Sequence, residues 1–146
     1  MKLFLIGATG RTGSEIVKQA LTRNDELVAY VRNPSKLNIN DPELTVIKGQ
    51  LDDVAKMASE MKGCNAVLVT LGNPISNSSG KLFSFAIPDI IKAMDQAKIK
   101  RLISLSALGV GTTLANTSYP YRMGAKGFLK GNFSDHEAGK RQLKNS

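Results

Sequence analysis

A glycine-rich segment directly after a short apolar run most constrains what this chain can fold into. The apolar run covers residues 3–6, and the next segment reads Gly7-Ala8-Thr9-Gly10-Arg11-Thr12-Gly13. A continuous apolar run that ends in glycine is typical of a strand buried on both faces of a parallel sheet. The next residues place apolar side chains on one helical stripe, namely Ile16, Val17, Ala20 and Leu21. The pattern predicts a strand, a tight turn and a helix, in which the glycines let a phosphate approach the backbone at the helix N-terminus.

Further strands and helices alternate along the rest of the chain. Apolar runs predict strands at residues 27–31, 44–47, 66–71 and 101–105. Helical spacing predicts two more apolar faces, one made by Val54, Met57, Ala58 and Met61 and one made by Ile87, Ile90, Ile91 and Met94. Pro88 is expected to start or kink the second of these helices, and Ser134 opens a last helix with a capping-box pattern. We therefore expect an α/β fold, a Rossmann-like doubly wound parallel sheet with strand order 3-2-1-4-5, as a single dinucleotide-binding domain over residues 1–146.

Composition and charge narrow the classes of partner. With 146 residues, 42% of them hydrophobic, the chain resembles one ordinary globular domain. The formal net charge is +8, but the basic residues are scattered and not interleaved with aromatic ones, so nucleic acid is not expected as the main ligand. No apolar stretch approaches the roughly 18 residues that a membrane span needs. We expect a cytoplasmic protein that binds neither membrane nor metal.

Cys64 is the only cysteine of the chain. A single cysteine can form neither an internal disulfide nor a thiolate metal cluster. Its position beside Gly63, at the end of a predicted helix, favours a small buried packing residue over a nucleophile.

Arg32 decides which dinucleotide the sequence favours. In NAD-selective domains an acidic residue at the end of the second strand receives the ribose 2′-hydroxyl, whereas this chain has Arg32 there, followed by Asn33 and, a little further on, Lys36. A guanidinium suits a 2′-phosphate, and no carboxylate stands at the strand end to repel one. NADP(H) is therefore the predicted cofactor. The alternative interpretation of Arg32 is a solvated surface charge.

Three stretches carry a resemblance to a known family: GATGRTG at residues 7–13, Tyr-Val-Arg-Asn-Pro at 30–34 and Arg-Leu-Ile-Ser-Leu-Ser at 101–106. They resemble the atypical short-chain dehydrogenase/reductase superfamily, in particular the NmrA-like NAD(P)H-binding group with its flavin reductase/biliverdin-IXβ reductase branch. The resemblance covers essentially the whole chain. Its most specific element is the glycine motif with the arginine inside it.

The resemblance implies roles for individual residues of the cofactor site. It assigns the pyrophosphate to Thr9, Gly10, Arg11 and Thr12, between the turn glycines Gly7 and Gly13, and the 2′-phosphate to Arg32. Leu71 and Gly72, after the fourth strand, would line the nicotinamide ribose. Relatives usually carry Gly-Asp near the adenine, where this chain has Gly49 followed by Gln50 and Leu51. Gln50 can still hydrogen-bond to adenine, so the departure affects one contact only.

The catalytic pair of ordinary dehydrogenases in this superfamily is missing from the sequence. That pair is Tyr-x-x-x-Lys, but Tyr119 is followed four positions later by Met123, and Tyr121 by Ala125. Ser106, at the predicted carboxyl end of strand five, and His136, in the first turn of the last helix, match residues implicated in the flavin/biliverdin reductase branch. The alternatives are a serine that caps local backbone and an exposed histidine without a chemical task.

Two functions from different classes remain open on the sequence. The first is an NADPH-dependent reductase that transfers hydride to a flat small-molecule acceptor such as a flavin, quinone or tetrapyrrole. The second is an NmrA-like dinucleotide-sensing regulator without turnover. A sugar-nucleotide epimerase is disfavoured because it needs the missing tyrosine motif.

Family members normally continue with another strand, so the chain is expected to be truncated at its C-terminus. A sheet edge exposed in this way favours a homodimer.

Overall fold

The computed structural model describes residues 1–72 and 82–105 of the chain. The described residues belong to two compact units, Met1–Leu71 with Asp89–Leu105 in one, and Gly72 with residues 82–88 in the other. The elements are β1 (Lys2–Ile6), α1 (Arg11–Thr22), β2 (Glu26–Val31), the short 3-10 helix η1 (Pro34–Lys36), β3 (Leu44–Lys48), α2 (Val54–Met61), β4 (Ala66–Val69), α3 (Leu82–Ala97) and β5 (Leu102–Ser104).

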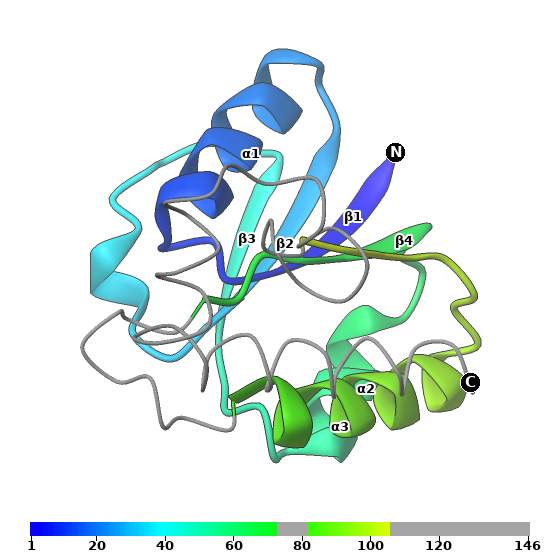
Figure 1. Cartoon of the computed structure of the whole chain (residues 1–146). Helices are drawn as coiled ribbons and strands as arrows, with labels where there is room; N and C mark the ends of the chain where they lie inside the picture. The colour runs from blue at the N-terminus through cyan, green and yellow to red at the C-terminus, as the bar shows by residue number, and fades with distance from the viewer. Residues whose placement is uncertain (73–81, 106–146) are drawn as a thin grey trace, which may run out of the picture. The chain divides into compact units, whose positions relative to one another are not determined.

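The strands form one parallel sheet in the order β3-β2-β1-β4-β5, which confirms the predicted topology. β1 is the central strand, with Leu5 opposite Ala29 of β2 and Leu68 of β4. Figure 1 shows α1 on one face of the sheet and α2 on the opposite face. The fold is thus the Rossmann-like, doubly wound α/β class that the alternation of strands and helices predicts.

Both faces of the central strands are buried, which explains their continuous apolar sequence. Successive side chains of a strand point to opposite faces, so Leu3 and Leu5 share one face of β1 while Phe4 and Ile6 share the other. On the first face, Val17 and Ala20 of α1 complete a core cluster with residues of β1, β2 and β4. The other face carries α2, whose Met57 and Met61 are fully buried, as the helical spacing predicts.

Some element boundaries differ from the predicted ones. β4 ends at Val69 and not at Leu71, although the amide of Thr70 still donates to the Ile6 carbonyl oxygen at 2.9 Å. Pro88 lies inside α3, six residues after its start, so it does not begin the helix. An apolar run shows that a strand exists but not where its hydrogen bonding stops.

Cys64 lies in the connection between α2 and β4. Gly63, which precedes it, has a φ of +78°, a left-handed conformation that commonly ends a helix. Cys64 itself is buried, as predicted, and burial raises the pKa of its thiol. A neutral buried thiol is a packing group.

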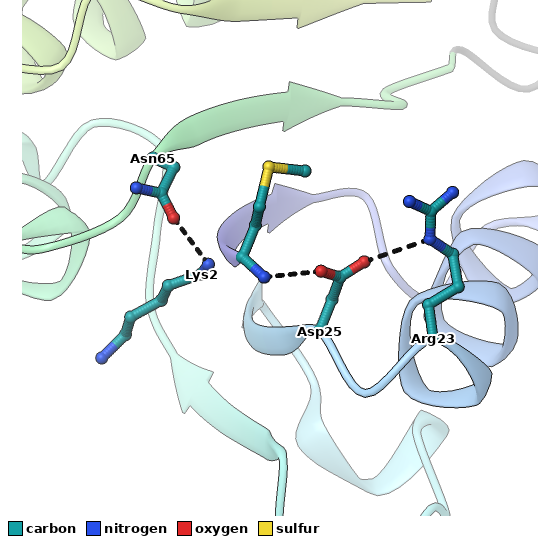
Figure 2. Close-up of polar contacts among 5 residues, drawn as sticks. Lys2, Arg23, Asp25 and Asn65 are labelled. Atoms are coloured by element: carbon teal, nitrogen blue, oxygen red, sulfur yellow. Dashed lines mark hydrogen bonds and ion pairs between the residues drawn. The ribbon is translucent and has the colours of Figure 1, made fainter.

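The start of the chain is tied to the connection between α1 and β2 by a group of polar contacts (Figure 2). The ammonium of Met1 lies 2.6 Å from Oδ1 of Asp25, whose side chain is only 12% exposed, and Nε of Arg23 lies 3.5 Å from Oδ2. The amide of Lys2 donates to Oδ1 of Asn65 over 2.8 Å. The hydrogen bond from the ammonium holds the pKa of Asp25 below its ordinary value, against the opposite effect of burial. These contacts fix the amino end of the central strand.

Replacing Asp25 by asparagine is expected to lower the melting temperature at neutral pH, because an amide forms no ion pair with the ammonium. Since the folded carboxyl has a lowered pKa, the ion pair stabilises the fold above about pH 4 and loses its effect as the pH falls through the folded pKa. Thermal melts followed by circular dichroism should show the difference between wild type and Asp25→Asn shrinking in acid. Asp95→Asn, at an exposed position of α3, is the matched control and should behave as wild type. A difference for Asp25→Asn that does not depend on pH would contradict the role of the ion pair.

Candidate functional site

The segments after β1, β2, β3 and β4 all leave the same edge of the sheet, because parallel strands share their carboxyl edge. β1 and β4 are neighbours at the point where the strand order reverses. Open α/β sheets bind ligands in the crevice outside this point. The edge therefore brings together the predicted residues of the glycine segment, Arg32, Gln50, Leu51 and Leu71.

The glycine segment makes a tight turn directly after β1. Gly7 has a φ of +93°, and a β-carbon at this position would lie 2.7 Å from Oγ1 of Thr70. The amide of Gly10 donates to the Gly7 carbonyl oxygen over 3.0 Å and closes the turn. The hydroxyl of Thr70 donates to the Ile6 carbonyl oxygen over 3.1 Å. Thr70, which no sequence motif indicates, therefore supports the turn from the neighbouring strand.

Gly13 lies in the first turn of α1 and is buried against the end of β1. A β-carbon on Gly13 would overlap the carbonyl oxygen of Gly7 and also lie 2.8 Å from Cα of Ala8. No larger residue allows this approach of helix to strand. The third glycine of the motif thus allows the helix and the strand to pack closely.

The N-terminus of α1 presents free backbone donors to the edge. Gly10 is the N-cap residue and provides no side-chain cap, and the first turn contains no acidic residue. Ser14 is the first residue of this turn whose amide is bonded, to the Gly10 carbonyl oxygen at 2.8 Å. No hydrogen bond within the described part of the chain uses the amides of Arg11, Thr12 or Gly13. Three amides with no bond to a described residue, at the positive end of a helix dipole, fit an anionic group such as a pyrophosphate.

The side chains around these amides are accessible. Thr9, Gly10, Arg11 and Thr12 are all exposed. A hydroxyl on either side of the arginine can donate to phosphate oxygens, and the guanidinium adds positive charge. The geometry therefore fits the phosphate role that the family resemblance implies for these residues.

Arg32 follows β2 directly and is exposed. Asn33 caps η1, because its Oδ1 accepts the amide of Ser35 at 3.2 Å and the hydroxyl of Ser35 at 2.7 Å. Neither Arg32 nor Lys36 forms an ion pair with any residue that the structure describes. Two cations without a counter-ion among the described residues, both close to the end of β2, suit a phosphate ester.

Gln50 and Leu51 follow β3, next to the end of β2. The amide of Gly49 donates to the Val31 carbonyl oxygen over 3.0 Å, which keeps the two strand ends together. Gln50 is exposed and Leu51 is half-buried. The hydroxyl of Tyr30 donates to the Gln50 carbonyl oxygen over 3.0 Å, a contact that sequence reasoning missed. Its one signal in the sequence is the glycine after β3, which leaves room for the ring.

Four predicted residues of the site remain: Leu71, Gly72, Ser106 and His136. Leu71 belongs to the unit that contains the sheet, and Gly72 belongs to the other unit. Ser106 and His136, the predicted catalytic residues, lie outside the described residues. Their roles stay predictions.

Across 1–72 and 82–105, no three histidine, cysteine or acidic side chains are grouped so that they could hold a metal ion. In the same ranges, no helix has the length and apolar character needed to cross a membrane.

The fold and the carboxyl edge define a dinucleotide-binding α/β protein. A model of the NAD(P)H-binding family matches residues 7–146, and the chain belongs to this family. The predicted resemblance is confirmed at this level: the chain is a member of an NAD(P)H-binding family and has a Rossmann-like fold.

Individual relatives agree with this placement. YwnB of Bacillus subtilis, an uncharacterized protein, is 29% identical over 109 residues, which cover 75% of this chain and 48% of YwnB. ChuY, an anaerobilin reductase of Escherichia coli O157:H7, has a TM-score of 0.76 at 18% identity, over 100% of this chain and 68% of ChuY. A short-chain dehydrogenase/reductase of Veillonella parvula in complex with NADP has a TM-score of 0.72 at 18% identity, over 99% of this chain and 64% of the other. The chain spans about half the length of the curated relatives it matches.

Alanine at Gly13 is expected to destabilise the fold, although alanine in a helix is normally favourable over glycine by about 1 kcal/mol. The overlap with Gly7 reverses the sign, and a loss of about 1–3 kcal/mol is expected from overpacking. Gly10→Ala is the matched variant, since its β-carbon would meet only the Gly7 carbonyl oxygen, at 3.3 Å. Urea denaturation should place Gly13→Ala well below wild type and Gly10→Ala within about 1 kcal/mol of it. Equal stability of the two variants would disprove the close approach.

Proposed function

We propose that this chain is an NADPH-dependent reductase that transfers hydride to a flat acceptor such as a flavin, quinone or tetrapyrrole. The observation that carries the proposal is the pairing of two anion sites on one sheet edge. The first consists of the amides of Arg11, Thr12 and Gly13, which have no bonding partner among residues 1–72 and 82–105. The second consists of Arg32 and Lys36, which lack a counter-ion among the described residues. A phosphorylated dinucleotide has a pyrophosphate for the first and a 2′-phosphate for the second.

The residues of the chain divide the binding task between backbone and side chains. The amides of the first helical turn bind the pyrophosphate without any change of conformation, because Gly7 and Gly13 already hold the helix against the strand. Arg32 binds the 2′-phosphate and thereby favours NADPH over NADH. Gln50 forms a hydrogen bond with the adenine. The likeness to a reductase in complex with NADP supports this assignment.

The proposed class of acceptor is based on the missing tyrosine motif and on the likeness to a known reductase. A bound nicotinamide supplies hydride directly, and a flat, electron-poor acceptor requires no tyrosine to exchange a proton with an alcohol. The missing Tyr-x-x-x-Lys motif is therefore compatible with such a reductase. The likeness to ChuY, a reductase, supports the same class. Within this proposal Ser106 and His136 orient the acceptor or relay a proton.

A second candidate is a regulator resembling the NmrA-like group, which would bind the same dinucleotide and contact a partner protein without turnover. The specific observation in its favour is again the missing tyrosine motif. Both candidates use the same cofactor site. They differ in whether the bound cofactor gives up hydride or alters a contact with a partner protein.

Arg32→Glu tests the cofactor choice. Wild type is expected to bind NADPH more tightly than NADH, and the variant is expected to lose about tenfold or more of its NADPH affinity, because a charge-assisted hydrogen bond is replaced by repulsion. NADH affinity should change little, since NADH has no 2′-phosphate. Isothermal titration calorimetry with both nucleotides measures the effect. Arg101→Glu, an equal change of charge at an exposed residue before β5, should leave both affinities unaltered. Equal NADPH and NADH affinities in the wild type would show that Arg32 does not select the cofactor.

Turnover separates the two candidate functions. The chain is expected to accelerate NADPH oxidation with at least one member of a panel of flavins, quinones and tetrapyrroles, measured by the loss of NADPH absorbance. NADPH binding without oxidation by any acceptor, together with a protein partner captured in only one redox state of the cofactor, would favour the regulator.

A further inference from the structure

The ring of Tyr30 lies under the turn after β3. Tyr30 is 3% exposed and is paired in register with Ile6 of β1 and Ile47 of β3. Its ring packs against Phe4 with the centroids 5.6 Å apart. Neighbours on both sides thus restrict the ring to one position, from which its hydroxyl reaches the carboxyl edge.

Tyr30 holds the turn at residues 49–50 through both its ring and its hydroxyl. A β-carbon on Gly49 would overlap the ring, so the backbone rests directly on it. The hydroxyl donates to the Gln50 carbonyl oxygen at 3.0 Å, and the amide of Asp53 donates to the same oxygen at 3.3 Å. The carbonyl oxygen therefore has both lone pairs occupied, and its orientation is fixed.

The hydroxyl remains a donor under ordinary conditions. Burial raises the pKa of Tyr30, and the negative charge of Asp53 adds to the effect. The phenol is therefore protonated at neutral pH.

The side chain of Gln50 is accessible, whereas its backbone carbonyl is held by two hydrogen bonds. It is exposed, and no hydrogen bond within the described residues uses its amide group. A fixed backbone with an available amide, one strand away from Arg32, is suited to orient a ligand group that both donates and accepts hydrogen bonds.

We propose that Tyr30 is a positioning residue for the adenosine end of the dinucleotide: its hydroxyl sets the backbone at Gln50, and through it the direction in which the Gln50 amide meets adenine. The inference rests on the proposed function. It assigns a role to Tyr30, which would act without contacting the cofactor. From the sequence alone, Tyr30 is only a residue of a buried strand.

The test compares a ligand that contains adenosine with one that does not. Tyr30→Phe keeps the ring and removes only the hydroxyl. It is expected to weaken binding of 2′,5′-ADP by about three- to tenfold, the effect of one hydrogen bond, and to leave binding of reduced nicotinamide mononucleotide within about twofold of wild type. Calorimetry with the two ligands measures both effects. Gln50→Ala should show the same selectivity, and the double variant should lose little more than either single one, because the two residues act through one contact.

Thr22→Val is the matched control, because it removes another hydroxyl that donates to a backbone carbonyl, over 2.9 Å to Lys18 at the end of α1. It should bind both ligands as wild type does. Hydrogen exchange gives a readout that needs no ligand: the Asp53 amide should exchange faster in Tyr30→Phe than in wild type, since its acceptor is no longer held.

Three results would overturn the inference: wild-type affinity of Tyr30→Phe for 2′,5′-ADP, equal weakening for both ligands, or additive losses in the double variant. A wild-type chain that binds neither ligand would instead refute the proposed function, and the inference with it. The two failures are therefore distinguishable.

Discussion

The approach of α1 to the end of β1 is the contact on which the candidate site depends. Gly13 packs so closely on the backbone of Gly7 that a single added carbon would overlap it. This contact brings the amides of the first helical turn, which no described residue bonds, to the carboxyl edge and keeps them there without a side-chain cap. An anion can then bind to donors that are already in place, which limits the entropic cost of binding.

The rest of the edge complements this anion site with side chains from neighbouring strands. Arg32 directly follows β2, and Gln50 follows β3. The hydrogen bond from the Gly49 amide to the Val31 carbonyl oxygen keeps the two strand ends adjacent. Under the proposed function, the backbone would bind the pyrophosphate, which every dinucleotide has, while side chains would bind the part that distinguishes one dinucleotide from another. The residues to which the proposal assigns selectivity are exposed, so they can change without disturbing the core.

Much of the fold could be predicted because local and global signals agree. Apolar runs correctly predicted five strands, helical spacing predicted the buried faces of α1 and α2, and the alternation of elements predicted the strand order. Boundaries were less accurate. The apolar run into Leu71 predicted a longer β4, because hydrogen bonding and neighbouring elements determine where a strand stops. Of the two expectations for Pro88, a start of the helix is wrong, since Pro88 lies inside α3. The predictions for Ser106 and His136 concern residues that the structure does not describe.

The sequence by itself determined the fold class, the glycine turn and the arginine at the end of β2, since each depends on residue types a few positions apart. Only the tertiary structure decided how distant residues meet. Tyr30 and Gln50 are 20 positions apart, and the ammonium of Met1 and Asp25 are 24 apart. Periodicity within one element contains no information about a contact between two elements, because strand register and helix docking together determine it.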